Sequence, residues 1–390
     1  MKLINKFKII SLGVMSSFFI FEIGLKLIER TPLWRVFPVI EPILGQPDNN
    51  VGFNFTPNAK GIWLKENRTK VKINSLGLRD FEYNSNLNNG LKILLTGDSM
   101  VEALQVDQLN NFENITEINL RRKDFNINIL NLAKSGDGPL RQLINLESKS
   151  ELLNPDFIIL FSTLEEFFSG ELLNDSLAPA YIKTPNNKFK RGYAFRNRWQ
   201  LRNSKNKTFI FFLNKLQNYP VLRMFYLRNR EGLKKLLWNK EKKQIVNKPK
   251  EYLCNRKKIE KYLTLIDDQS NSESKKVFNF FLKDLSNSYK INKIPKIYII
   301  NSIPIPNFAC ENQIKNRKLL VSKLDALFET YGIKFIDFNI RLNNIPEFNK
   351  NEIKFSGGHL NYFGHKMYSI VLTDLVYDFL KENNFMNYRN

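Results

Sequence analysis

The chain has 390 residues, of which 43% are hydrophobic, so it can bury a large core and is not expected to be disordered. Sixty lysines and arginines against 38 aspartates and glutamates give a formal charge of +22. The basic residues are scattered, and no zinc-finger, RRM or helix-turn-helix motif accompanies them, so no nucleic-acid partner is expected. The charge leaves anionic lipid or an acidic polymer open as a partner.

The first 30 residues resemble a membrane segment. Three lysines within the first eight residues precede an apolar run of about thirteen, which extends past Glu22 to about seventeen, the short end of a transmembrane helix. No small-x-small cleavage site follows, so residues 1–30 are predicted to form an uncleaved signal anchor with a cytoplasmic N-terminus. This topology predicts a single-pass protein of the inner membrane with its main domain in the periplasm. A buried amphipathic helix is the alternative.

Residues 31–90 contain five prolines and Asn-rich turns, which exclude a long helix, and we interpret them as a connecting region. Within it, residues 70–80 alternate like a short strand and end in a turn at Gly77.

Residues 91–390 show strands alternating with helices. Short continuous apolar runs of this kind predict an α/β fold with a parallel five-stranded sheet covered on both faces. The five runs lie at 91–96, 127–132, 156–161, 296–301 and 333–338. A helix is predicted at about 363–382, where apolar residues recur every four positions.

A segment at about 170–290, rich in basic residues, Asn and aromatics, is predicted to be a helical insertion. It could form a lid or substrate wall, rest on an anionic membrane, or simply present a solvated basic face. Cys254 and Cys310 are too far apart for a C-x-x-C pair. One disulfide in an oxidising compartment and two free thiols both remain open.

Gly97-Asp98-Ser99 follows the first strand and precedes a helical pattern. A glycine before a hydroxyl at such a junction can bring a serine to the open end of the sheet, beside a helix N-terminus that favours negative charge. Ser99 is therefore the candidate nucleophile, and an ordinary surface turn is the alternative.

Only two histidines, His359 and His365, could act as the base that a serine nucleophile requires. His359 lies in a Gly-rich loop after the last strand and is the candidate. His365 falls in the predicted final helix, where a packed or surface imidazole is expected. Two histidines six apart without an acidic cluster match no metal-ligand spacing, and neither a metal nor another cofactor is expected.

Four blocks in this order resemble the SGNH hydrolases, also called GDSL-type esterases. They are G-D-S at 97–99, N-L-A-K-S-G-D-G-P at 131–139, P-D-F-I-I-L-F at 155–161 and G-H-L-N-Y-F-G-H at 358–365. The resemblance covers about 91–169 and 295–380. Upstream, V-G-F-N-F-T-P-N and I-N-S-L-G-L-R-D resemble the lead-in of membrane-anchored bacterial members. The resemblance implies a three-layer α/β/α, flavodoxin-like fold.

It also implies roles for three residues: Ser99 as nucleophile, His359 as base, and Gly136 as the donor of a backbone N–H to the oxyanion. The family's Asn, a second oxyanion donor, is replaced here by Glu165, with Glu166 at the following Asp position. An ionised carboxylate there would be an acceptor facing a developing negative charge.

The acid that orients the histidine in this family usually stands two or three residues before it, where this chain has Gly357 and Ser356. No triad acid is therefore evident. Thr163 or Ser162 could replace the missing oxyanion donor with a hydroxyl.

Two hypotheses for the function remain. One is a membrane-anchored, exported esterase or acyltransferase that acts on an ester of a cell-envelope glycan or lipid. The other is a catalytically inactive protein of the same fold that binds a glycan or scaffolds an envelope assembly complex.

Overall fold

The computed structural model describes most of the chain. The described residues are 2–29, 45–63, 66–67, 69–82, 90–168, 179–193, 258–267, 272–288, 290–291, 293–303, 310–349, 352–356, 358–383 and 385.

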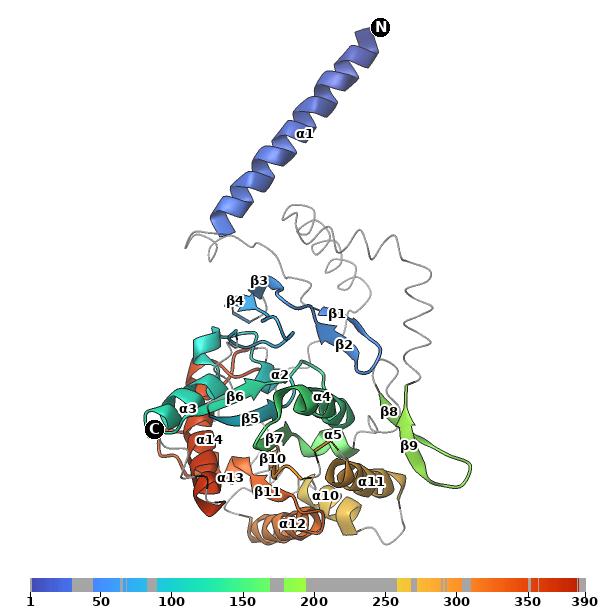
Figure 1. The fold of residues 1–390 in the computed structure, drawn as a ribbon, viewed down its shortest axis with the longest axis vertical. Helices are drawn as coiled ribbons and strands as arrows, with labels where there is room; N and C mark the ends of the chain where they lie inside the picture. The colour runs from blue at the N-terminus through green and yellow to red at the C-terminus, as the bar shows by residue number, and fades with distance from the viewer. Residues whose placement is uncertain are drawn as a thin grey trace.

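A five-stranded sheet in the order β11-β10-β7-β5-β6 forms the centre of the fold, and every neighbouring pair of its strands is parallel (Figure 1). The strands are β5 (Leu91–Thr96), β6 (Ile127–Asn131), β7 (Phe157–Ser162), β10 (Lys296–Ile300) and β11 (Lys334–Asp337). The predicted α/β fold and all five predicted strands are thus confirmed. Since the strands are parallel, their carboxyl ends share one edge, and residues that follow β5, β6 and β7 meet there.

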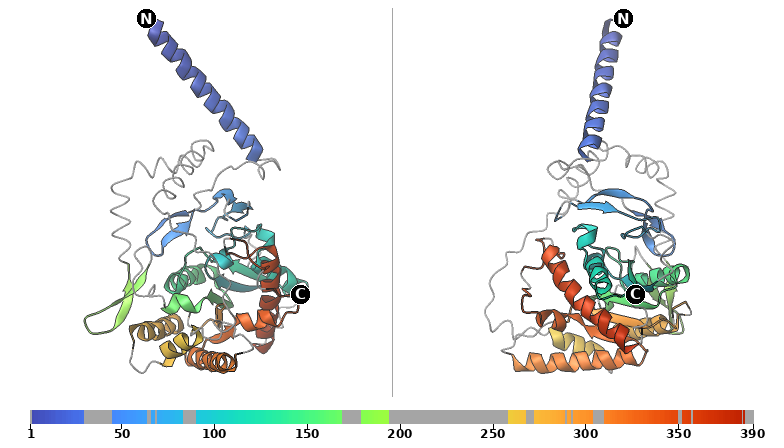
Figure 2. Two further views of the ribbon diagram at one scale, coloured as in Figure 1. Left: turned by 180° about the vertical axis from the view of Figure 1, so that it is seen from behind. Right: turned by 60° about the vertical axis from the view of Figure 1, so that its left-hand side comes forward.

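Helices cover both faces of the sheet, as Figures 1 and 2 show. The side chains on both faces are apolar and buried. Within β5, Ile93 and Leu95 belong to the core on one face and Leu94 to the core on the other. This two-sided burial explains why the strands are continuous apolar runs. The first face packs against α3 (Phe112–Arg121), α13 (Phe338–Asn343) and α14 (Tyr362–Glu382). The other packs against α4 (Pro139–Leu153), α5 (Leu164–Phe168), α10 (Lys258–Asp267), α11 (Glu273–Asn287) and α12 (Glu311–Glu329).

The predicted signal anchor coincides with α1 (Lys2–Glu29), which carries exposed apolar side chains such as Leu12 and Ile20. Across the described part of the chain, no helix combines the length and the apolar character needed to cross a membrane.

The predicted connecting region contains two β-hairpins. They consist of β1 (Gly45–Asp48) with β2 (Gly52–Phe55) and β3 (Lys60–Trp63) with β4 (Thr69–Lys72). The strand and turn expected near residue 70 are confirmed as β4 and a turn in which Gly77 has φ of +73°. Asn74 holds that turn, because its side-chain oxygen accepts hydrogen bonds from the backbone N–H groups of Leu76 (3.0 Å) and Leu78 (2.9 Å). Leu78 is buried in the main core, so this region is an integral part of the fold.

The predicted insertion is described in part. A hairpin of β8 (Ala180–Lys183) and β9 (Phe189–Gly192) is joined to the helices by Arg191, which pairs with Glu147 of α4 (2.6 Å) and Asp284 of α11 (2.8 Å). Residues 194–257, which carry the basic and aromatic stretches considered as a lid or membrane contact, lie outside the described residues, as does Cys254. Cys310 is disulfide-bonded.

Candidate active site

Ser99 lies where the chain leaves β5, as the first residue of the short helix α2 (Ser99–Glu102), and its side chain is half-buried. The turn requires glycine before it, because a Cβ on Gly97 would lie 2.3 Å from a methyl group of Val101 and 3.1 Å from the carbonyl oxygen of Phe161. Asp98 caps the helix, since its carboxylate accepts a hydrogen bond from the backbone N–H of Met100 at 2.8 Å. The sequence G-D-S thus forms a tight turn that fixes the serine at the carboxyl edge of the sheet.

His359 lies beside this serine. Its Nε2 is 3.0 Å from Ser99 Oγ, within hydrogen-bond distance, although 260 residues separate the two. The loop is folded back on itself, because the Phe355 N–H donates to the His359 carbonyl at 2.8 Å and Lys354 bridges to Leu360. The His359 side chain is 33% exposed, so a substrate can approach the pair from solvent.

The second ring nitrogen of His359 faces a carboxylate that sequence reasoning missed. Nδ1 of His359 is 2.7 Å from Oε2 of Glu66, and the His359 backbone N–H donates to Oε1 of the same carboxylate at 3.4 Å. The Glu66 side chain is only 8% exposed. A carboxylate here favours the tautomer with the proton on Nδ1, which leaves Nε2 free to accept the proton of Ser99. Ser99, His359 and Glu66 therefore have the connectivity of a catalytic triad.

The residues that flank Glu66 attach its turn to the main domain. Asn67 donates from Nδ2 to the carbonyl of Gln105 at 3.1 Å, and Thr69 donates from Oγ1 to the carbonyl of Leu104 at 2.5 Å. Gln105 in turn donates to the carbonyl of Leu360, the residue after the histidine, at 3.2 Å. Glu66 itself has φ of +62°, a left-handed conformation that costs free energy in any residue with a Cβ. These tertiary contacts hold the carboxylate at the imidazole in spite of that cost.

The orienting acid thus differs from the sequence expectation. Of the two positions before the histidine at which a carboxylate was sought, Ser356 is exposed and Gly357 lies outside the described residues. The carboxylate comes from the hairpin between β3 and β4, 293 positions away in sequence. The sequence did offer one signal. The blocks V-G-F-N-F-T-P-N and I-N-S-L-G-L-R-D, which resemble the family's lead-in, lie on either side of residue 66 and suggest that this region belongs to the fold.

Gly136 lies in the loop after β6 with φ of +77°, which favours glycine. The loop that contains Gly136 contacts the turn of Ser99 at two points. The Lys134 N–H donates to the Gly97 carbonyl at 3.4 Å, and the Ser135 hydroxyl donates to the carboxylate of Glu102 in α2. Burial raises the pKa of Glu102 to about 7. The structure therefore brings the Gly136 loop to the turn of Ser99, as the resemblance implies.

Glu165 is arranged differently from an oxyanion donor. It is exposed on α5 and hydrogen-bonded to Tyr262 of α10, where burial and the charge of Glu165 raise the pKa of Tyr262 to about 12. Ser162 is buried and accepts a hydrogen bond from the Tyr298 hydroxyl at 3.0 Å, while Thr163 is half-buried. The backbone N–H groups of Ser99 and Gly136 remain the candidate oxyanion donors.

The engagement of Glu165 with Tyr262 leads to a testable expectation. Glu165→Asn is expected to leave the reaction rate at Ser99 unchanged, because the side chain lies against α10. The measurement is the rate of ester cleavage, or of covalent labelling of Ser99, in the two proteins. A rise of about tenfold or more would show that residue 165 reaches the oxyanion, where one donor is worth a factor of roughly 10² to 10³.

His365, the other histidine, is fully buried in α14. It stacks on the Phe112 ring at 5.7 Å between centroids, and its Nδ1 accepts the Phe112 backbone N–H at 3.3 Å. Burial, with a smaller contribution from the charge of Arg79, lowers its pKa to about 3, so it stays neutral. Of the two alternatives left open by the sequence, a packed and a surface imidazole, the structure shows the packed one.

No protein-family model matches the sequence, and a search of curated proteins found no significant match. Comparison with solved structures returned esterases and acylhydrolases. A member of the lipolytic protein G-D-S-L family from Veillonella parvula aligns with TM-score 0.32 and 13% identity, over 73% of this chain and 97% of its own. A family 3 carbohydrate esterase from Clostridium thermocellum aligns with TM-score 0.37 and 10% identity, over 75% of this chain and 98% of its own. For esterase EstA from Pseudoalteromonas sp. the TM-score is 0.36 and the identity 11%, over 74% of this chain and 98% of its own. The roles of Ser99, His359 and Gly136 rest on the geometry of this site.

Proposed function

We propose that the protein is a serine esterase or acyltransferase of the SGNH type. The observation that carries the proposal is the continuous chain of contacts from Ser99 Oγ to His359 Nε2 (3.0 Å) and from His359 Nδ1 to Glu66 Oε2 (2.7 Å). A serine hydroxyl is a weak nucleophile unless a base removes its proton, and this arrangement supplies both the base and the group that orients it.

In the proposed reaction, Ser99 Oγ attacks the ester carbonyl while His359 Nε2 takes the hydroxyl proton. The backbone N–H groups of Ser99 and Gly136 stabilise the oxyanion, and Glu66 stabilises the imidazolium. His359 then gives the proton to the departing alkoxide, which leaves an acyl-serine. Water or an acceptor hydroxyl, deprotonated by the same histidine, releases the acyl group. Hydrolysis and transfer share the acyl-serine, so the site supports both.

The proposal also covers location and substrate. The enzyme is attached to the inner membrane and has its main domain in the periplasm. Its substrate is an ester of an envelope glycan or lipid. The basic N-terminus followed by an apolar run supports the attachment, and α1 exposes apolar side chains such as Phe19 and Ile20. The disulfide at Cys310 supports an oxidising compartment.

A fluorophosphonate probe tests the chemistry directly, because it forms a covalent adduct only with an activated serine. The wild-type protein is expected to be labelled and Ser99→Ala is not. Ser322→Ala, which removes an exposed hydroxyl from α12, should be labelled like the wild type. If no Ser99-dependent adduct forms at any tested pH, the proposed enzyme is inactive and the non-catalytic binding role becomes the better hypothesis.

The proposed location has its own test. A reporter enzyme that works only outside the cytoplasm, fused after residue 390, is expected to be active. Activity of a cytoplasm-specific reporter at the same position would contradict both the proposed signal anchor and the proposed periplasmic location.

A further inference from the structure

A polar pocket lies between the β1–β2 hairpin and α4, with a volume of about 290 Å³. Asp48, Asn50 and Asn54 line it from the hairpin, and Asn145 and Ser148 from α4. Sites for small molecules begin at about 300 Å³ and are usually apolar. This pocket has the size for one small ring, and its lining is mainly amide, hydroxyl and carboxylate groups.

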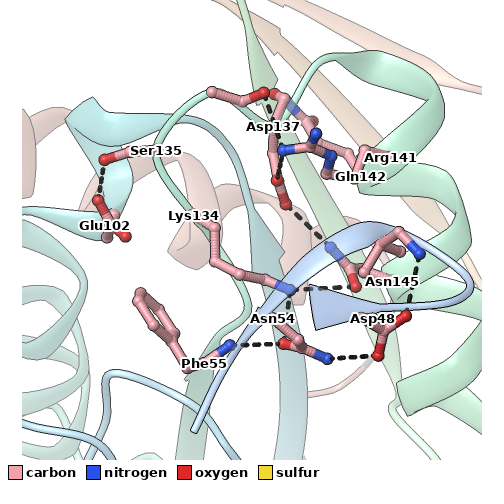
Figure 3. Close-up of polar contacts among 12 residues, drawn as sticks. Asp48, Asn54, Phe55, Glu102, Lys134, Ser135, Asp137, Arg141, Gln142 and Asn145 are labelled. Carbon is pink, nitrogen blue, oxygen red and sulfur yellow. Dashed lines mark hydrogen bonds and ion pairs between the residues drawn. The ribbon is translucent and has the colours of Figure 1, made fainter. Parts of the chain in front are cut away.

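The two walls are fixed to each other by a buried lysine. Lys134 is 3% exposed, and its Nζ donates to Oδ1 of Asn54 at 2.8 Å and to Oδ1 of Asn145 at 3.2 Å. Asn145 Nδ2 donates to Asp137 at 2.9 Å, and Asn54 Nδ2 donates to Asp48 at 3.4 Å. Figure 3 shows this network bridging the hairpin and the helix. The two amide side chains therefore have defined orientations before any ligand arrives, which reduces the entropy cost of binding.

The charged side chains around the pocket have partners within the protein. Glu147 pairs with Arg191 at 2.6 Å, and Glu151 pairs with Lys290 at 2.5 Å. The Asp48 carboxylate accepts the backbone N–H groups that follow it. In the described part of the chain, no group of acidic, His or Cys side chains is arranged to hold a metal ion. The lining itself carries three carboxylates, Asp48, Glu147 and Glu151, against one lysine, which disfavours an anion. Carboxylates and amides accept hydrogen bonds readily, so the pocket favours a neutral ligand that donates several of them.

A neutral ligand that matches mixed donors and acceptors must itself both donate and accept hydrogen bonds at several points. Hydroxyl groups do this, whereas an apolar ligand would leave the polar lining desolvated without partners. A sugar ring combines several hydroxyls with a small apolar face, and the pocket offers Val51 and Ile144 to that face. The lining thus fits a sugar better than the other neutral small molecules.

The pocket is connected to the candidate active site through one loop. Lys134 and Asp137 hold the pocket residues Asn54 and Asn145, and Ser135 of the same loop binds Glu102 in the helix of Ser99 (Figure 3). The loop also contains Gly136, the candidate oxyanion donor. We propose that this pocket binds one sugar residue of a glycan substrate, separate from the residue that carries the ester. The proposal rests on the proposed function for the substrate class only, because binding requires no catalysis.

Direct titration tests the pocket. The full-length Ser99→Ala protein, which cannot turn over a substrate, is titrated with N-acetylglucosamine and with methyl glucoside by isothermal calorimetry. Saturable binding of at least one sugar is expected. Ser148→Trp, which fills the pocket, should weaken that binding by roughly tenfold or more. Leu152→Trp is the matched control, since Leu152 lies on the same helix, is 62% exposed and does not line the pocket. It should bind like the parent.

Two results would overturn the proposal: no saturable binding of either sugar, or equal affinity in the Ser148→Trp and Leu152→Trp proteins. Circular dichroism of both variants establishes that they are folded. Fluorophosphonate labelling of Ser99 is measured separately, in the wild-type protein. A pocket that binds no sugar in a protein that labels would refute this inference and leave the esterase proposal standing.

Discussion

Glu66→Gln is expected to lower kcat by roughly 10⁴ with little change in KM, because an amide in place of the orienting carboxylate leaves the imidazole in the wrong tautomer. Its carboxylate is 2.7 Å from Nδ1 of His359 and nearly buried, so no water or other side chain can easily replace it. The measurement is steady-state hydrolysis of a p-nitrophenyl ester, together with the rate of fluorophosphonate labelling of Ser99, which reports the same activation without turnover.

Glu82→Gln is the matched control. Glu82 belongs to the same N-terminal region and is bonded to Ser75, away from the imidazole, so the substitution should leave both rates unchanged. Thermal unfolding of the two variants separates loss of activation from loss of structure. A Glu66→Gln protein that folds and retains rates within tenfold of the wild type would show that the carboxylate does not orient the base.

Arg79→Met is expected to lower the free energy of unfolding by about 3–5 kcal/mol, the cost of removing one partner from a buried charged network. Arg79 is 1% exposed and donates to the carbonyls of Glu102 (3.0 Å) and Val106 (2.6 Å). Its charge also opposes the desolvation of two fully buried carboxyl groups, Glu102 and Glu113, whose pKa values burial raises. Methionine fills the volume but leaves these carbonyls and carboxyls without a cation.

Denaturant titration measures this effect. Arg122→Met, an exposed substitution at the end of α3, provides the control and should change stability by no more than about 0.5 kcal/mol. Equal stability of the two variants would contradict the inferred role of Arg79. A loss confined to Arg79→Met would show that the link between the N-terminal region and the helix of Ser99 contributes to folding.

The sheet could be predicted from sequence because its determinants are local. Each strand, such as Leu91–Thr96, is buried on both faces, so burial leaves a continuous apolar run that composition alone reveals. The close packing around Gly97 likewise leaves a local mark, a glycine between strand and serine. The histidine could be chosen because the chain has only two, and the Gly-rich loop distinguished His359 from His365.

The rest of the site depends on contacts between distant segments. Glu66 lies in a turn whose sequence has no catalytic pattern, and its role appears only when the β3–β4 hairpin packs beside the histidine loop. Counting along the chain from Pro155, just before β7, placed Glu165 at the oxyanion Asn position that the resemblance implies. The structure instead joins Glu165 to Tyr262, a contact with a helix from the insertion that spacing along the chain cannot reveal.

Glu66, the acid of the site, comes from the β3–β4 hairpin and not from the central sheet, so activity depends on the N-terminal region. A chain shortened to begin at Gly90 would keep the nucleophile, the base and every strand of the sheet, and yet lack the carboxylate. Catalytic competence therefore depends on the docking of the N-terminal hairpins as well as on the sheet. The β3–β4 hairpin is part of the catalytic apparatus, and a variant in which it is displaced is expected to have an inactive Ser99.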